Sequence, residues 1–351
     1  MSVFILIALI VLVLAVIYQI GRASEFATLL RGEEKVQAST NRIMGWVMLL
    51  MFPVGMWGIY ACHQALKDKL LPVSASVQGD EYDFMLYITI VMTGIVFVIT
   101  QGLLCWFAFR YQSTEKRKAY FYAHNNRLEI IWTTVPALAM AVLVIIGLRH
   151  WFNITSEAPA DAQIVEVVGK QFNWIIRYPG ADGVLGKRNF QLINNENNVL
   201  GLDTTDRQNY DDVVLENGEV HVVVNRPVKF IIGSRDVIHD VGLPHFRYKM
   251  DAVPGITTTI WFTPKITTAQ MKEITGNPNF VYEIACDQMC GKGHYAMRGT
   301  IVVETEEEHA AWMAKQQPYL KGGQEPAPAP SAIDSNAAPA TPMPAKTITK
   351  L

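Results

Sequence analysis

The sequence predicts a membrane-anchored all-β protein, in which four N-terminal transmembrane helices precede a β-sandwich. Two observations support this prediction. Half of the 351 residues are hydrophobic, and the long apolar runs all lie before residue 151. After about residue 162 the apolar residues come in short segments rich in Val, Ile, Thr and aromatic residues, with Gly, Pro and Asn between them, which is typical of strands. The net charge of −2 gives no reason to expect a nucleic-acid partner.

Four apolar runs have about the length that a helix needs to cross a bilayer. A cleaved signal peptide is the alternative for the first run, but the run lacks a basic N-terminal region and a small-x-small cleavage site before Gly21. We therefore expect a retained anchor. Pro53 and Pro136 lie inside the second and fourth runs, as membrane helices often tolerate. The four runs are residues 3–20, 43–62, 84–109 and 130–148.

Charges in the loops predict the orientation of these spans. The loop after the first run and the loop at residues 110–127 are rich in Lys and Arg, whereas the loop between the second and third runs also carries several acidic residues. The positive-inside rule then makes the first and third loops cytoplasmic. Both termini and the β domain would face outward, into the periplasm if the membrane is a bacterial inner membrane.

Six segments of the C-terminal half are predicted strands, and several short strands with turns between them indicate a sandwich or a barrel. Thr305 and Glu308 have the spacing of a capping box and predict a terminal helix that ends before Pro318. The predicted strands are residues 163–168, 219–224, 228–232, 257–262, 280–285 and 300–303.

One stretch concentrates metal-binding side chains. Cys286, Cys290, His294 and Met297 place two thiols, one imidazole and one thioether in a single loop. Soft sulfur ligands select copper, zinc or iron–sulfur centres, and a methionine favours copper. The spacing alone leaves two alternatives open, a disulfide in an oxidising compartment and a zinc site. No Cys-x-x-Cys-His motif occurs, so we expect no covalently attached c-type haem in this chain.

The spacing Cys-x3-Cys-x3-His-x2-Met resembles the dinuclear copper (CuA) loop of cytochrome c oxidase subunit 2. Two upstream segments extend the resemblance, Ser-Arg-Asp-Val-Ile-His at 234–239 and Asp-Ala-Val-Pro-Gly at 251–255. With the last two apolar runs as the family's transmembrane hairpin, it covers roughly residues 83–316. The resemblance favours copper over a disulfide or zinc, and it implies a cupredoxin-like Greek-key β-sandwich without a fused cytochrome c domain.

The resemblance also implies the ligands. Both cysteines would bridge two copper ions; His239 with Met297 would complete one ion, and His294 with the backbone carbonyl of Gln288 the other. His245 is the nearest alternative to His239 in the sequence, and His221 lies in a strand pattern that indicates a packing or surface role. The implied ligands are His239, Cys286, Gln288 (backbone carbonyl), Cys290, His294 and Met297.

Two positions depart from the family. The family usually has glutamate where Gln288 stands, and its side chain helps hold a magnesium or manganese ion between subunits. Glutamine is a poorer ligand for a hard cation, so the interfacial magnesium is in doubt, although Asp251 matches an acidic family position near it. Phe172 replaces the family's first tryptophan, the usual electron entry point, while Trp174 keeps the second. The alternative for both aromatic residues is the sandwich core.

Glu129 opens the fourth run within Leu-Glu-Ile-Ile-Trp-Thr at 128–133, which resembles the family's Glu-x-x-Trp-Thr segment. In the family this glutamate lies at the mouth of a proton-uptake path in the partner subunit. An acidic residue at membrane depth is a functional candidate. The alternative is a carboxylate that the dipole favours at a helix N-terminus.

The resemblance implies a subunit of a respiratory haem–copper oxidase. It would take electrons from cytochrome c, or from a docked quinol-oxidising donor complex, and pass them to haem in oxidase subunit 1, where oxygen is reduced to water and protons are pumped. Two rival classes remain, a copper-free quinol oxidase subunit and a copper-delivery protein. The copper content distinguishes the three classes. Two ions indicate the oxidase subunit, no copper indicates the quinol oxidase subunit, and one exchangeable ion indicates the copper-delivery protein.

The chain therefore divides into four expected parts. Residues 1–82 hold two extra helices, 83–152 the hairpin, 153–320 the copper domain, and 321–351 a Pro/Ala-rich flexible tail. Residues 180–217 form an insertion rich in Asn, Asp and Gly. Its aspartates fit no regular calcium loop, so a solvated loop is expected.

Overall fold

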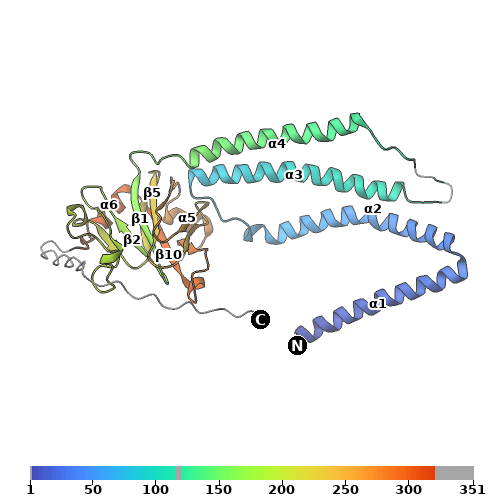
Figure 1. Cartoon of the computed structure of the whole chain (residues 1–351), viewed down its shortest axis with the longest axis horizontal. Coiled ribbons are helices and arrows are strands. Elements are labelled where there is room, and N and C mark those ends of the chain that lie inside the picture. Colours follow the sequence, from blue (N-terminus) through green and yellow to red (C-terminus); the bar gives the residue numbers. More distant parts are fainter. Residues whose placement is uncertain (1, 115–116, 118–119, 321–351) are drawn as a thin grey trace, which may run out of the picture.

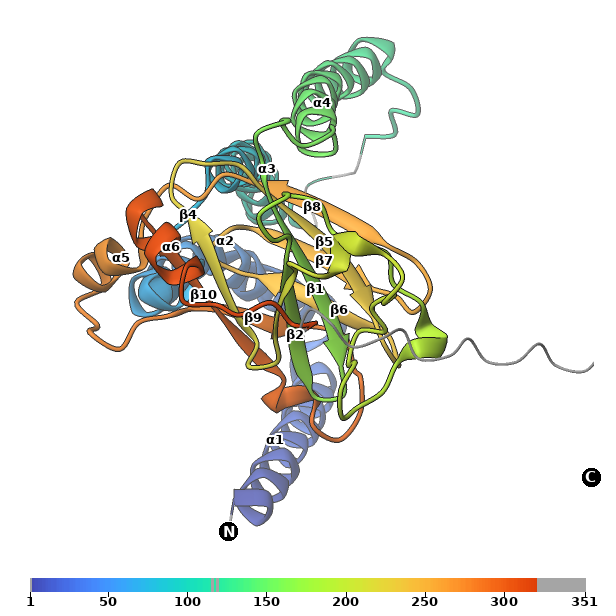
Figure 2. The same ribbon diagram turned by 90° about the vertical axis from the view of Figure 1, so that its left-hand side faces the viewer.

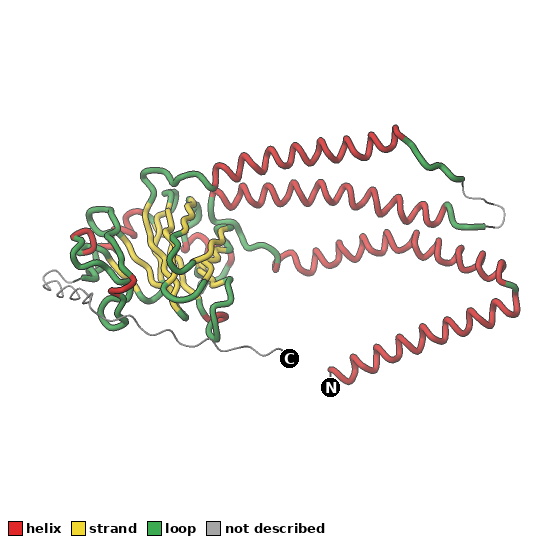
Figure 3. The backbone as a smooth tube through the Cα atoms, in the orientation of Figure 1, coloured by secondary structure: helices red, strands yellow, loops and turns green. Residues whose placement is uncertain are grey.

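Four long helices extend from one end of a β domain in the computed structural model, which describes residues 2–114, 117 and 120–320 (Figure 1). Within these residues, four helices are long and apolar enough to cross a membrane, as the sequence predicts. Figure 3 shows the separation of the helical half from the strands. The helices are α1 (Ser2–Arg31), α2 (Glu33–Leu66), α3 (Val77–Arg110) and α4 (Asn126–Ile154).

Each helix is longer than its apolar run because polar residues cap and extend it. The Ser76 side chain accepts a hydrogen bond from the Gly79 amide at 2.9 Å and starts α3. The Asn125 side chain accepts one from the Leu128 amide at 3.1 Å and starts α4. Caps of this kind contribute about 1 kcal/mol each. The expected boundary at residue 82 consequently falls inside α3.

The β domain is built from two five-stranded sheets, in the orders β3-β2-β1-β5-β8 and β4-β10-β9-β6-β7. Figure 2 shows this domain in front of the helices. The β1–β5 and β4–β10 pairs are parallel and the others antiparallel, so each sheet joins strands that lie far apart in the sequence. The strands are β1 (Gln163–Lys170), β2 (Asn173–Tyr178), β3 (Val213–Leu215), β4 (Glu219–Val223), β5 (Val228–Ser234), β6 (His239–Leu243), β7 (Tyr248–Ala252), β8 (Thr258–Phe262), β9 (Tyr282–Cys286) and β10 (Arg298–Glu304).

All six predicted strands are confirmed, and four strands were not predicted. The sequences of β6 and β7 contain Gly, Asp and Lys, which are uncommon in strands. Their backbone is held by the ladder from His239–Ala252 to Leu243–Tyr248. His239 is the first residue of β6. The terminal helix α6 (Glu306–Met313) begins with the predicted capping box, and a second short helix, α5 (Thr268–Thr275), was not predicted.

The insertion packs against the first sheet instead of forming a solvated loop. Val199, Leu200 and Leu202 are buried against Val168 and Ile175 of that sheet. Its aspartates do not converge on one point: Asp203 and Asp206 accept hydrogen bonds within local turns, and Asp212 is buried against Arg177. The expected tail, residues 321–351, lies outside the described residues.

Polar contacts join the start of α3 to the underside of the β domain. Arg247 donates to both carboxylate oxygens of Asp83, at 2.8 and 2.9 Å, and to the carbonyl of Pro72 at 2.6 Å. The Ser76 hydroxyl donates to the Phe246 carbonyl at 2.9 Å. The third transmembrane helix and the β domain are therefore in direct contact.

Candidate metal centre

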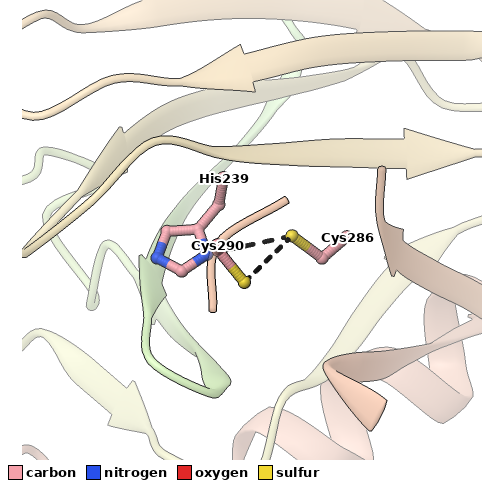
Figure 4. Close-up of side chains that lie close together, drawn as sticks. All are labelled: His239, Cys286 and Cys290. Carbon is pink, nitrogen blue, oxygen red and sulfur yellow. Dashed lines mark hydrogen bonds between the residues drawn. The ribbon is translucent and has the colours of Figure 1, made fainter. Parts of the chain in front are cut away.

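The metal-binding side chains meet at the end of the sandwich formed by β6 and β9. Cys286 ends β9, and Cys290 lies in the loop that follows it. His239 starts β6, which pairs with β9 in the same sheet, so the ladder holds the imidazole near the cysteines. Figure 4 shows the His239 ring and the two thiols together.

Five contacts connect the implied ligands through the two sulfur atoms. Cys286 Sγ lies 3.8 Å from Cys290 Sγ, 3.8 Å from His239 Nδ1 and 3.3 Å from the Gln288 carbonyl oxygen. Cys290 Sγ lies 3.9 Å from His294 Nδ1 and 3.9 Å from Met297 Sδ. Two ligands of one tetrahedral ion stand about 3.5 Å apart when metal–ligand bonds are about 2.0–2.3 Å. These separations fit metal coordination.

The geometry does not support the disulfide alternative. Both cysteines are free, and their sulfur atoms are 3.8 Å apart, whereas a disulfide bond is about 2.05 Å long. A structural zinc site takes four ligands, but here four further donor atoms lie around the two sulfurs, which makes six donors in all. Two thiolates, two imidazoles, a thioether and a carbonyl are the soft and intermediate donors that suit copper.

Burial and the neighbouring Cys286 favour the protonated form of the metal-free Cys290 thiol. Burial, and then hydrogen bonding and electrostatic repulsion from Cys286, raise the pKa of Cys290 to about 11. Cys286 is 7 % exposed and Cys290 4 %. Because the thiolate is the form that binds metal, binding releases protons from this pair.

Two neighbours that the sequence did not single out, Asp236 and Gly169, fix the His239 ring. Its Nε2 lies 2.8 Å from Asp236 Oδ1, which leaves Nδ1 facing the sulfurs. Although burial opposes ionisation of Asp236, hydrogen bonds from the Gln171 amide, His239 and the Val237 amide lower its pKa. A Cβ on Gly169 would stand 2.6 Å from His239 Cδ2, so only glycine leaves room for the ring. Asp236 lies inside the matched 234–239 segment, which was the available signal; Gly169 had none.

The two aromatic candidates take different positions. Trp174 is fully buried, as the core alternative proposed, and its ring lies 6.0 Å from that of His239. Phe172 is 40 % exposed and covers the metal-binding loop, where Cβ atoms on Gly291 and Gly293 would stand 3.0 and 2.5 Å from its ring. Phe172 is thus a surface residue above the cysteines.

The residues considered for an interfacial ion lie beside the centre. Gln288 directs its carbonyl to Cys286 while the residue is otherwise exposed. Asp251 is exposed on β7 directly opposite Asp240 on β6. Burial, followed by a hydrogen bond with Asp251, raises the pKa of Asp240 to about 7. Asp240 and Asp251 thus place a carboxyl pair beside the metal centre, where Gln288 offers no carboxylate.

The remaining candidates lie away from the centre. Glu129 is exposed in the first turn of α4, at the end of the helices far from the β domain (Figure 1). His245 packs against Phe280 and Tyr282, with ring centroids 5.1 and 5.3 Å apart. His221 is buried and stacks on Trp312 at 3.9 Å, which confirms the packing role expected of it.

Two family models match the chain. The model of the cytochrome c oxidase subunit II periplasmic domain matches residues 163–306, and that of the transmembrane domain matches residues 60–151. The alternative cytochrome c oxidase subunit 2 of Bradyrhizobium diazoefficiens is 35% identical over 237 residues, which cover 68% of this chain and 80% of the relative. The chain belongs to the cytochrome c oxidase subunit 2 family.

Two further comparisons show lower identity to this chain. The cytochrome c oxidase subunit 2 of Thermostichus vulcanus is 26% identical over 274 residues, covering 71% of this chain and 79% of the relative. The crystal structure of the periplasmic domain of cytochrome oxidase subunit II of Bradyrhizobium japonicum covers 45% of this chain and 95% of its own, with 25% identity and a TM-score of 0.30.

As a cytochrome c oxidase subunit 2, the chain is a membrane protein whose β domain lies in the periplasm, and it is the subunit of a haem–copper oxidase through which electrons enter. The predicted family, fold class and location are confirmed. The family models begin at residue 60. The first helix and most of the second are therefore additions to the matched part.

Proposed function

We propose that electrons enter through a dinuclear copper centre held by the six implied ligands. The observation that supports this is the pairing of donors around two thiols 3.8 Å apart: His239 and the Gln288 carbonyl lie near Cys286, and His294 and Met297 near Cys290. One ion would leave donors unused, whereas two ions bridged by both sulfurs use all six.

When bound, a copper pair of this kind accepts and releases single electrons. The chain contributes a rigid set of ligands to that chemistry. Cys286 and His239 belong to paired strands, and Asp236 holds the imidazole by its other nitrogen, so the ligands keep their positions when the charge changes. The buried sulfurs exclude water from the centre.

We infer that the electron donor, cytochrome c or a docked donor complex, contacts the surface around Phe172. This ring is partly exposed, lies between β1 and β2 in the sequence, and packs against the loop that carries the ligands. A phenyl ring has no N–H donor, unlike the tryptophan usual in the family, so recognition there relies on apolar contact. We further propose that Glu129, exposed at the cytoplasmic end of α4, lies near the proton entrance of the partner subunit.

The proposal is tested by the copper content and the paramagnetic resonance spectrum of the full chain. We expect two copper ions per chain and a hyperfine pattern of one electron shared by both nuclei. Cys286→Ser should abolish the shared signal, whereas Met297→Leu should keep two ions and shift the redox potential. His245→Gln is the control and should leave both unchanged.

Other copper contents would contradict the proposal. Absence of copper from a folded chain would favour the quinol oxidase alternative, and a single exchangeable ion would favour copper delivery. Loss of both ions from Met297→Leu would show that the thiolates are not the main ligands.

A further inference from the structure

Three arginines line a cavity at the end of the helices far from the β domain. Its volume is about 540 Å³, and it lies where α2 begins and α3 ends (Figure 1). Because the β domain is periplasmic and α3 crosses the membrane, this end of α3 is cytoplasmic. The lining residues are Ala38, Arg42, Phe109, Arg110, Gln112, Thr114 and Arg117.

Packing between the two helices builds the walls of this cavity. The Trp46 and Phe109 rings lie 4.7 Å apart, and Gly45 is buried against the side chain of Gln112. Arg117 Nη1 donates to the Arg110 carbonyl at 2.5 Å, which places the Arg117 guanidinium at the end of α3. The site is thus formed jointly by an extra helix and by the family's hairpin.

Among the described residues, the lining of the cavity carries three positive charges and no acidic side chain. No acidic residue is among its lining residues, and within the described part of the chain Arg42, Arg110 and Arg117 form no ion pair. Glu34 lines a separate cavity of about 210 Å³ that shares Ala38 and Thr114 with this one. Three guanidinium groups that line one cavity favour a bound anion.

We propose that this cavity binds the phosphate headgroup of an anionic phospholipid from the cytoplasmic leaflet. A guanidinium matches two phosphate oxygens at once, and basic pockets between membrane helices on this side suit anionic headgroups. The apolar surface beside the cavity accommodates acyl chains, since Ile43, Met44 and Trp106 are exposed on α2 and α3. The lipid would thereby link the extra helix α2 to the hairpin.

The test uses the full chain in detergent and native mass spectrometry with added phosphatidylglycerol, cardiolipin or phosphatidylcholine. The triple variant Arg42→Gln, Arg110→Gln, Arg117→Gln removes the site. The control, Arg22→Gln, Arg127→Gln, Arg149→Gln, removes the same charge from positions outside the cavity. We expect the site variant to lose affinity for the anionic lipids about ten-fold or more. The control should bind like the unmodified chain, and phosphatidylcholine should not distinguish the proteins.

A third variant with lysine at the three positions separates charge from geometry, and it should bind anionic lipid with intermediate affinity because lysine keeps the charge but cannot bind bidentately. Circular dichroism and copper loading show whether the glutamine variant folds. If it does not fold, the lysine variant tests the proposal, and an affinity for anionic lipid equal to that of the unmodified chain would overturn it. Equal binding by the chain and its glutamine variant would also overturn it. So would displacement of the lipid by millimolar inorganic phosphate, which would indicate a site for the free anion.

Discussion

At the scale of single residues, the metal centre depends on neighbours as much as on ligands. The ligand positions could be predicted because their types and spacing are all local to two short segments. The supporting residues could not, because their roles depend on the folded sheets. Gly169 belongs to β1 in one sheet and His239 to β6 in the other, and four strands lie between them in the sequence. Only the packing of the two sheets brings these residues together. Nothing in a glycine beside a strand indicates an imidazole above it.

Asp236 is the supporting residue with the clearest consequence. In Asp236→Asn the neutral amide still reaches His239 but no longer accepts with a full negative charge, so the ring is held less firmly and is a weaker base. We expect copper affinity to fall about 10–100-fold, the usual effect of losing such a partner. Copper titration against a competing chelator measures this change. Asp206→Asn, in a turn of the insertion, is the control, and an equal loss there would contradict the assignment.

At the scale of elements, the insertion before β3 is held to the sheet by a buried ion cluster. Arg177 on β2 contacts Asp212 and lies 3.1 Å from Glu166, and it also donates to Asn209 and to the Gly186 carbonyl at 2.7 Å. The composition of this segment suggested a solvated loop because polar residues dominate it. The three apolar residues that anchor it are too few to form a periodic pattern, so its packing could not be predicted.

Arg177→Met should therefore destabilise the β domain strongly. Removing Arg177 leaves the buried Asp212 without its cation, while Glu166 keeps only its contact with Arg188, and breaking a buried pair in this way costs about 3–5 kcal/mol. Chemical unfolding followed by tryptophan fluorescence measures the loss. Arg226→Met is a suitable comparison, since this exposed arginine makes one hydrogen bond, to the Asp161 carbonyl. Similar losses in the two variants would show that the cluster contributes little.

The terminal helix α6 should make stability depend on pH. Burial, and then the nearby His221 and Arg226, lower the pKa of His309, whose Nε2 lies 2.8 Å from the Gln163 amide nitrogen. The unfolded chain then binds a proton more readily than the folded chain, so stability is lost as pH falls below about 6.5. We expect His309→Gln to reduce this loss between pH 7 and 5 in unfolding titrations. His124→Gln, at an exposed position, should leave the slope unchanged.

At the scale of the whole molecule, the sequence predicted both halves but not their junction. Apolar length predicted four helices, and short punctuated segments predicted six of the ten strands found in the described residues. The contacts of Arg247 with Asp83 and Pro72 join residues far apart in the chain. No sequence pattern around Arg247 or around residues 72–83 predicts these contacts. The same holds for the arginine cavity, whose lining residues come from two separate segments.

Asp83→Asn should loosen this junction without unfolding either half. The nearly buried Arg247 would lose a charged partner that is itself about one-third exposed, so we expect a cost of about 1 kcal/mol. Hydrogen exchange should accelerate in residues 72–83 and 244–249. Asp80→Asn is the matched control on the same helix, because its contact with Lys265 is more exposed and such pairs contribute little. Unchanged exchange in Asp83→Asn would contradict this role.

The junction has a consequence for respiration itself. Electron tunnelling between two centres slows steeply as their separation grows. If the β domain moved relative to the transmembrane helices, the rate of electron transfer would therefore fluctuate. The Arg247–Asp83 contact joins the start of α3 to the periplasmic domain, and we expect it to limit this motion. We therefore expect this contact, which lies away from the metal-binding loop, to help keep Cys286 and Cys290 at a constant distance from the bilayer.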